Sequence, residues 1–247
     1  MTDVITTRRL TRDYGNGAGI FDVDLTVPRG TVFGLVGPNG AGKTTLLGIL
    51  SGLRRADSGT VSAVPGGVLL CPDVPDFEPW LTAREVVALG AETFGRGVTD
   101  REVTECLARV GLVKEADRRC GQFSRCMRQR LGLAAALVCR PGVLVLDEPA
   151  SGLDPQGRVD VLELIGELRE HCTVVLTSHL LGDVQRVCDD VAVLVRGRIV
   201  HRGPVADIAD RGRPNAWHLR IRASAEGLVA RLVAEPWVRH VGVVEPD

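Results

Sequence analysis

The sequence from residue 31 to residue 45 reads Thr-Val-Phe-Gly-Leu-Val-Gly-Pro-Asn-Gly-Ala-Gly-Lys-Thr-Thr. The apolar run over 32–36 predicts a buried strand, and an apolar helical run follows Lys43. The segment between them matches G-x-x-x-x-G-K-[ST] in the strand–loop–helix context that this pattern requires. Such a loop binds phosphate, because glycine lets its backbone N–H groups point inward and the helix adds its positive end. The match predicts a nucleoside triphosphate site formed by Gly37, Pro38, Asn39, Gly40, Ala41, Gly42, Lys43, Thr44 and Thr45.

Two side chains of this loop have defined roles at such a site. Lys43 would reach the β- and γ-phosphates, and the Thr44 hydroxyl would ligate Mg²⁺. Lysine is rare in this chain, which otherwise uses arginine, and a compact ammonium suits a phosphate. The alternative, an ordinary glycine-rich turn, does not explain the full pattern in this context.

Composition and charge limit the classes of protein that fit. The chain has 247 residues, of which 45% are hydrophobic and 25% charged, as is ordinary for a globular protein of one or two domains. A net charge of −1 gives no field that would attract nucleic acid or an acidic membrane. We expect neither a membrane span nor a signal peptide, because no apolar run is long enough and the N-terminus is not basic. Seven scattered cysteines without a Cys-x-x-Cys motif favour reduced thiols in the cytoplasm.

Apolar strands alternate with helices along most of the chain. This alternation predicts an α/β fold with a mainly parallel sheet that is covered on both faces. A turn-rich segment joins the first two strands, which predicts an antiparallel β region at the N-terminus. Capping-box patterns at Thr82 and Thr99 begin helices of a largely helical insertion over about 74–140. The other predicted elements are strands at 4–10, 20–27, 32–36, 58–71, 143–146, 173–176 and 191–195, and helices at 44–53, 127–139, 156–170 and 180–188.

The periodic signal weakens after about residue 204. We therefore expect one main domain over 1–205 and a small α/β appendage over 206–247. Within the appendage, the pattern predicts a strand at 217–222 and a helix at 226–232.

Chemically useful side chains follow two of the predicted strands. The strand at 143–146 leads into Asp147-Glu148, and His179 closes the next apolar strand. In a parallel sheet these carboxyl ends lie at one edge, where ligands bind. Asp147 would hold Mg²⁺, Glu148 would polarise a water for in-line attack on the γ-phosphate, and His179 would donate a hydrogen bond to that phosphate. The alternatives are a loop start for the two acids and a surface or capping histidine, and the phosphate loop upstream counts against both.

The order of these elements resembles the ATP-binding subunit of ABC transporters over residues 1 to about 205. Phe123-Ser124-Arg125-Cys126-Met127 aligns with that family's signature sequence, at the family's distance before Asp147. A phosphate loop is shared by many NTPases, whereas this signature in this order is specific. The resemblance implies a P-loop NTPase core, ATP as the nucleotide, and a dimer in which two subunits sandwich two ATP molecules.

Three further residues take roles from the resemblance. Ser124 and the N-terminus of its helix would bind the γ-phosphate of the partner's ATP. Asp154, in Ser151-Gly152-Leu153-Asp154, matches the loop that communicates across the dimer. Both residues also fit helix N-caps, Asp154 with Pro155 at the first helical position. Tyr14, which by spacing alone reads as a half-buried loop aromatic, matches the residue that stacks on adenine.

Two positions depart from the family pattern. The family's glutamine before the helical insertion contacts Mg²⁺ and water; it aligns with Asp73, which can still ligate Mg²⁺ but is shorter and charged. The second glycine of the signature aligns with Cys126. A side chain there would crowd the γ-phosphate, and a non-glycine residue resists a positive φ. We therefore expect Cys126 to impair closure of the dimer without abolishing it.

The expected function is ATP hydrolysis that powers a separate membrane permease, in the multidrug or antibiotic export branch that the surroundings of the signature resemble. The expected partners are a second ATPase subunit and the permease, a cytoplasmic helix of which would dock on the helical insertion; no nucleic-acid partner is expected. The protein would act in the cytoplasm, at the inner face of the membrane. Two alternatives stay open: a soluble ABC-type regulator acting on ribosomes or DNA, and a partly degenerate subunit of a heterodimeric transporter.

Overall fold

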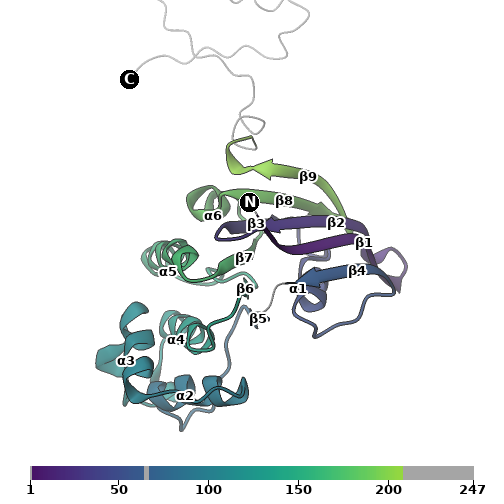
Figure 1. Cartoon of the computed structure of the whole chain (residues 1–247). Helices are drawn as coiled ribbons and strands as arrows, with labels where there is room; N and C mark the ends of the chain where they lie inside the picture. The colour runs from purple at the N-terminus through teal and green to yellow at the C-terminus, as the bar shows by residue number, and fades with distance from the viewer. Residues whose placement is uncertain (1, 64–66, 208–247) are drawn as a thin grey trace, which may run out of the picture. The chain divides into compact units, whose positions relative to one another are not determined.

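Two β-sheets with flanking α-helices make up the part of the chain that the computed structural model describes, residues 2–63 and 67–207 (Figure 1). An antiparallel sheet has the strand order β2-β1-β4, and a larger sheet has the order β5-β6-β7-β3-β8-β9. The strands are β1 (Asp3–Gly15), β2 (Ala18–Pro28), β3 (Val32–Val36), β4 (Ser58–Ala63), β5 (Val68–Cys71), β6 (Val143–Leu146), β7 (Thr173–Ser178), β8 (Asp190–Val195) and β9 (Arg198–Pro204). The helices are α1 (Lys43–Leu50), α2 (Ala83–Thr93), α3 (Asp100–Arg109), α4 (Arg125–Leu137), α5 (Pro155–Glu167) and α6 (Leu181–Val187).

The larger sheet is buried on both faces at its central strands, β6, β7 and β3. Its strands β5, β6, β7, β3 and β8 run parallel, and β9 pairs antiparallel with β8. Successive residues of β6 enter different cores: Val143 and Val145 pack with α1 and the antiparallel sheet, whereas Leu144 and Leu146 pack with α4 to α6. A strand covered in this way reads as a continuous apolar run, which is why the sequence pattern predicted it. The mixed fold confirms the predicted α/β class.

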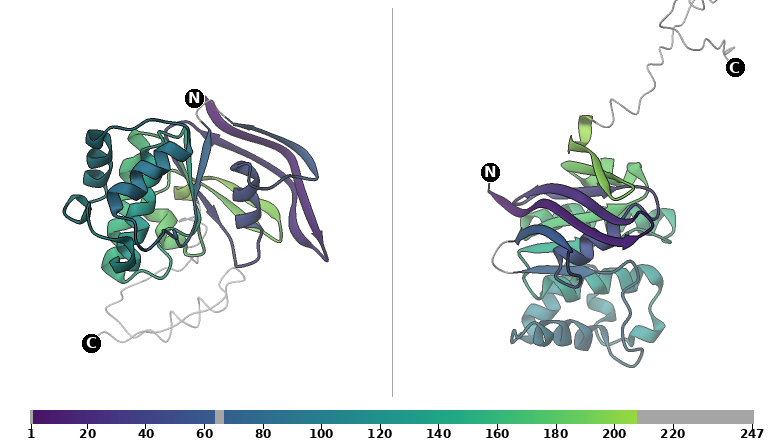
Figure 2. Two further views of the ribbon diagram at one scale, coloured as in Figure 1. Left: turned by 90° about the horizontal axis from the view of Figure 1, so that it is seen from below. Right: turned by 90° about the vertical axis from the view of Figure 1, so that its right-hand side faces the viewer.

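Helices α2, α3 and α4 form the insertion between β5 and β6 (Figure 2). Thr82 and Thr99 each accept a hydrogen bond from the N–H three residues on, and the glutamates at those positions bond back, so both predicted capping boxes are confirmed. Helix α4 contacts both β5 and α5, so it joins the insertion to the sheet.

Some predicted boundaries differ from the structure. The region at 58–71 forms two strands in different sheets, and α4 begins at Arg125 rather than at about 127. Strand β9 was missed, because exposed and half-buried side chains alternate along it without an apolar run. The elements predicted at 217–222 and 226–232 lie outside the described residues. Within 2–63 and 67–207, no helix combines the length and apolar content needed to cross a bilayer.

The carboxyl ends of β3, β6 and β7 lie at one edge of the larger sheet. The parallel register pairs Val36 with Ser178 and Leu146 with Leu176. The segments that begin at Gly37, Asp147 and His179 therefore leave the sheet side by side, at the edge where α/β sheets bind their ligands.

Candidate functional site

The segment from Gly37 to Gly42 connects β3 to α1, and Thr45 lies in the first turn of that helix. Gly37 has no room for a side chain, because a Cβ there would lie 2.2 Å from the carbonyl oxygen of Leu194. Gly42 precedes α1 with a φ of 102°, in the left-handed region that glycine favours. The loop therefore turns tightly onto the N-terminus of α1, where backbone N–H groups can bind phosphate.

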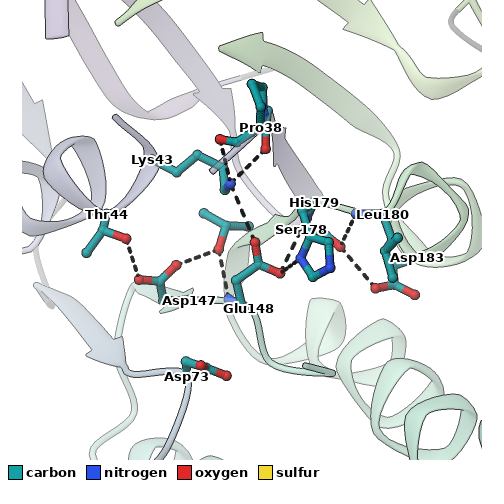
Figure 3. A network of polar contacts seen from close by, with 12 residues as sticks. Pro38, Lys43, Thr44, Asp73, Asp147, Glu148, Ser178, His179, Leu180 and Asp183 are labelled. Carbon is teal, nitrogen blue, oxygen red and sulfur yellow. Dashed lines mark hydrogen bonds and ion pairs between the residues drawn. The ribbon is translucent and has the colours of Figure 1, made fainter. Parts of the chain in front are cut away.

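The side chain of Lys43 is buried against this loop. Its Nζ donates to the carbonyls of Gly37 (2.7 Å) and Pro38 (3.4 Å) and lies 3.5 Å from Oε1 of Glu148 (Figure 3). A buried ammonium needs such partners, because its transfer out of water without them would cost several kcal/mol. Lys43 is thus placed to exchange a loop carbonyl for a phosphate oxygen.

Asp147 connects the phosphate loop to the neighbouring strand. Its Oδ2 accepts a hydrogen bond from Oγ1 of Thr44 (2.9 Å), and its Oδ1 accepts one from Oγ1 of Thr177 (2.7 Å). The same Thr177 oxygen accepts from the backbone N–H of Glu148 (2.8 Å). Because Thr177 is fully buried in β7, its hydroxyl fixes the positions of both acids that follow β6.

Glu148 is held in an unusual conformation. Its φ is 46°, in the left-handed region that non-glycine residues rarely adopt. Its Oε2 accepts from the backbone N–H of His179 (3.3 Å) and from Nδ1 of the same imidazole (2.8 Å). A carboxylate can only accept, so the proton of this contact lies on Nδ1, and donation from Nε2 to a phosphate requires the doubly protonated ring. Local strain that is held by several partners is typical of functional sites.

The oxygen atoms at the Thr44–Asp147 contact fit a small divalent cation. Mg²⁺ binds oxygen donors, commonly one or two carboxylates together with the phosphates of a substrate. Thr44 and Asp147 bring a hydroxyl and a carboxylate oxygen to within 2.9 Å of each other beside the phosphate loop. This donor set is the one that the sequence predicted for these two residues.

Asp73 lies near the same edge but faces another partner. Its carboxylate accepts a hydrogen bond from Arg125 (3.4 Å), and Figure 3 shows it turned away from the Thr44–Asp147 contact. The pKa of Asp73 is raised, first by burial; the guanidinium of Arg125 opposes this shift, and the carboxylates of Asp147 and Glu148 add to it. A role for Asp73 as a Mg²⁺ ligand stays a prediction.

The signature residues begin helix α4. Ser124 is its N-cap, and the Ser124 Oγ accepts from the N–H of Met127 (3.2 Å), which confirms the predicted cap. Cys126 lies inside the first turn and does not have a positive φ. The predicted strain at this position was therefore wrong, because any L-residue adopts helical angles. The Cys126 sulfur points toward the start of α5, 3.2 Å from where a Cβ on Gly157 would lie.

Asp154 is the N-cap of α5. Its Oδ2 accepts from the N–H of Gly157 (3.4 Å), and Pro155 occupies the first helical position, as predicted. The loop at 151–154 therefore ends at a capped helix. Its role across a dimer stays a prediction.

Tyr14 stands at the end of β1 and is 47% exposed. Its hydroxyl accepts a hydrogen bond from Arg54 (2.9 Å), and the guanidinium carbon of Arg12 lies 5.0 Å from the ring centroid. The pKa of Tyr14 is lowered, chiefly by the Arg54 hydrogen bond, and a contact with the Thr45 hydroxyl contributes. The ring is thus beside the phosphate loop and accessible for stacking on a base.

Sequence reasoning missed two buried polar residues of this site, Thr177 and Asp183. Thr177 directly follows the apolar run 174–176 of β7, and Asp183 lies on the buried side of α6. A polar residue in an apolar run, a few positions from a candidate catalytic residue, is the signal that would have found both.

A family model described as ABC transporter matches residues 20–151. The chain is 34% identical to the uncharacterized ABC transporter ATP-binding protein YxlF of Bacillus subtilis, over 96% of this chain and 82% of that protein. It is 33% identical to the bacitracin transport ATP-binding protein BcrA of Bacillus licheniformis, over 86% of this chain and 74% of that protein. It is also 36% identical to the methionine import ATP-binding protein MetN 2 of Pseudomonas aeruginosa, over 74% of this chain and 61% of that protein.

The fold matches that of a solved ATP-binding cassette, a dimer in a post-hydrolysis state bound to ADP and Pi. The TM-score is 0.72, with 81% of this chain and 98% of that chain covered. At 22% identity, this likeness shows the fold.

Proposed function

The chain belongs to the ABC transporter family, as an ATP-binding and ATP-hydrolysing subunit, and on that premise we propose that it dimerises on ATP and powers a separate membrane permease. The observation that carries the proposal is the hydrogen-bonded chain that runs from Thr44 through Asp147, Thr177 and Glu148 to His179. It gathers a cation-binding pair, a carboxylate and an imidazole beside one phosphate loop.

Each group in this chain has a role in hydrolysis. Lys43 and the loop N–H groups bind the β- and γ-phosphates, and this positive charge stabilises the transferring phosphoryl group. Glu148 orients the attacking water and accepts its proton, and the left-handed backbone holds its carboxylate toward the loop lysine. His179 donates from Nε2 to the γ-phosphate while Nδ1 stays on Glu148.

Thr44 and Asp147 would hold Mg²⁺. When bound, Mg²⁺ neutralises the charge that develops on the phosphate oxygens. Thr177 keeps the Asp147 carboxylate directed at Thr44 by occupying its other oxygen.

The second half of each nucleotide site comes from a second ATPase subunit. Ser124 and the N-terminus of α4 would bind the γ-phosphate held by the partner's loop, and the loop at 151–154 would face the partner. Closure on ATP and opening after hydrolysis then drive the transport cycle, because ATP and its products differ in affinity for the closed state.

The permease would dock on the helical insertion. Five large apolar side chains of this segment are exposed although many of its other apolar residues are buried: Val74, Trp80, Leu89, Phe94 and Val113. An amphipathic cytoplasmic helix of the permease would cover such residues. On this proposal the subunit acts in the cytoplasm, at the inner face of the membrane.

We assign export of drugs or other hydrophobic compounds as the direction, on the similarity to BcrA. The similarity to MetN 2 makes import the competing direction. ATP-dependent accumulation of a peptide antibiotic in inside-out vesicles supports export. Accumulation only in right-side-out vesicles contradicts it.

Affinity purification from solubilised membranes tests the transporter function. We expect the tagged chain to retain a polytopic membrane protein, and Trp80→Asp to lose that protein while it keeps ATP binding. Recovery of ribosomal proteins alone would overturn the transporter function in favour of a soluble regulator.

The residues at the signature favour one variation, a heterodimer in which this chain supplies the weaker signature. Cys126 stands where the resemblance implies a glycine of the signature, whereas Lys43, Glu148 and His179 are present around its own loop. In such a heterodimer, the purified chain alone hydrolyses ATP slowly. A second ATPase subunit raises the rate of hydrolysis of the ATP that is bound by the phosphate loop of this chain.

A further inference from the structure

A second polar chain lies behind His179. Asp183 in α6 forms an ion pair with Arg158 in α5. Its Oδ1 accepts a hydrogen bond from Nε of Arg158 at 2.7 Å and lies 2.5 Å from Nη2 of the same guanidinium. The other Asp183 oxygen accepts from Oγ of Ser178 at 3.0 Å, and that Oγ accepts from the N–H of Leu180 at 3.0 Å. We call Arg158, Asp183, Ser178 and the N–H of Leu180 the Asp183 bridge.

The groups of the Asp183 bridge hold fixed positions because the Asp183 carboxylate is buried. Asp183 is 7% exposed and Ser178 is 3% exposed. A carboxylate removed from water in this way is stable only while its partners stay in place. Each group of the bridge therefore restricts the position of the next.

In the sequence, His179 lies between the two residues that the bridge holds. Figure 3 shows Glu148 on one side of the imidazole and the Ser178, Leu180 and Asp183 contacts on the other. Glu148 holds the imidazole from the side of the phosphate loop, and the bridge fixes the backbone from behind. Leu180 precedes α6 and has no side-chain cap of its own, but the Ser178 hydroxyl accepts from the N–H of Leu180.

The other end of the bridge is tied to the loop at 151–154. Arg158 lies in the first turn of α5, and its backbone N–H bonds to the carbonyl of Asp154 at 2.9 Å. A displacement of Asp154 therefore moves the start of α5 together with the guanidinium that holds Asp183.

We propose that Asp183 is a positioning residue that sets His179 against Glu148 and, through Arg158, makes the position of His179 depend on the loop at 151–154. This inference rests on the proposed function, which gives His179 its role at the γ-phosphate and gives the loop its place in the dimer. Such coupling lets the His179 imidazole take its position at the γ-phosphate only when the loop at 151–154 is in its place in the dimer.

The chain offers a matched control on the same two helices. Arg186 in α6 and Glu163 in α5 form an ion pair of 2.7 Å on the surface, with side chains 45% and 60% exposed. This pair also joins α5 to α6, but it has no bond to the segment around His179. A substitution that removes one charge of this pair therefore measures the general effect of weakening the contact between α5 and α6.

The direct test is the nitrogen signal of the His179 ring in the full chain with ¹⁵N-labelled histidine. Only five histidines contribute, and His179→Gln identifies the signal. We expect Asp183→Asn to shift it and Glu163→Gln to leave it in place. An unchanged signal in Asp183→Asn, or an equal shift in both variants, would overturn the positioning role. The measurement needs no turnover, so its outcome is separate from the fate of the proposed function.

Kinetics in two backgrounds distinguish positioning from a general structural role. In the otherwise native chain, we expect Asp183→Asn to lower kcat about tenfold, as partners that orient a functional side chain commonly do, with little change in KM. With His179 already replaced by alanine, Asp183→Asn should have no further effect. An equal loss in both backgrounds would show that Asp183 does not act through His179.

A double substitution distinguishes displacement of His179 from unfolding of the chain. Arg158→Met with Asp183→Leu replaces the buried ion pair by apolar groups of similar size, which commonly preserves folding. We expect a melting temperature near that of the wild type but a displaced His179 signal; a native signal would contradict the inference. Asp154→Ala should then shift the His179 signal in the otherwise native chain and not in this double variant, and equal shifts in both would refute the coupling to the loop.

Discussion

Replacing Thr177 by valine tests how the two acids after β6 are held. The change removes one hydroxyl of a fully buried side chain, which donates to Asp147 at 2.7 Å and accepts from the N–H of Glu148 at 2.8 Å. A hydrogen bond to a charged group contributes about 2 kcal/mol, and the N–H left unpaired adds about 1 kcal/mol, so the expected loss of stability is about 3 kcal/mol. For a chain of this size, the melting temperature should fall by about 6–12 °C.

The matched control is Thr173→Val in the same strand. Thr173 is also buried, but its Oγ1 accepts only from the N–H of Gly30 at 2.9 Å. We expect Thr173→Val to cost about 1–2 kcal/mol and to leave ATP turnover within about twofold of the wild type. Thr177→Val should lower kcat/KM for ATP by about 10- to 100-fold, because Asp147 and Glu148 lose their common support.

Differential scanning calorimetry and steady-state ATPase assays measure both effects. Thr177→Ser, which keeps the hydroxyl, should restore most of the turnover. Equal ATPase activity in Thr177→Val and Thr173→Val would refute the view that Thr177 orients the catalytic acids.

Three other substitutions test single positions. Cys126→Gly should raise the ATPase rate about fivefold, about 1 kcal/mol off the barrier, by restoring the glycine that the family signature implies; an unchanged rate would show that the sulfur, which points toward the start of α5, is harmless. Asp73→Asn should gain thermal stability relative to the wild type as pH rises from about 4 to 6, because the pKa of Asp73 is raised above its ordinary 3.8 and the folded wild type is penalised as this acid ionises. A constant difference in melting temperature across that range would contradict the burial argument. Tyr14→Ala should weaken ATP binding about tenfold while inorganic triphosphate binds as before, since base stacking contributes about 1–3 kcal/mol; equal losses for both ligands would contradict stacking.

The parts of the fold that depend on local pattern could be predicted from the sequence. Residues 143–146 are apolar throughout because β6 is covered on both faces, and the predicted strand has the bounds found in the structure. The phosphate loop was predictable because its glycines and Lys43 are spaced by the geometry of one continuous segment. The caps at Ser124 and Asp154 were predictable for the same reason.

The rest depends on contacts between segments that are distant in sequence. Thr177 acts on Asp147 only because β6 and β7 pair in parallel, and Asp183 is held only because Arg158 of α5 lies beside α6. The pairing of Asp73 with Arg125 joins residues that are 52 positions apart in the sequence. Cys126 shows the opposite error, since the family comparison suggested a strained backbone where the chain forms an ordinary helical turn.

Glu148→Gln tests most directly whether two chains complete each other's nucleotide sites. This variant keeps the phosphate loop and the size of the side chain but cannot accept a proton from water, so ATP should remain bound. Light scattering after gel filtration should give a mass of twice 26.5 kDa with ATP and Mg²⁺, and 26.5 kDa without nucleotide. Adding Lys43→Ala should restore the single mass, because the loop then lacks its phosphate-binding ammonium. A Glu148→Gln chain that stays at the single mass in saturating ATP would contradict the composite site.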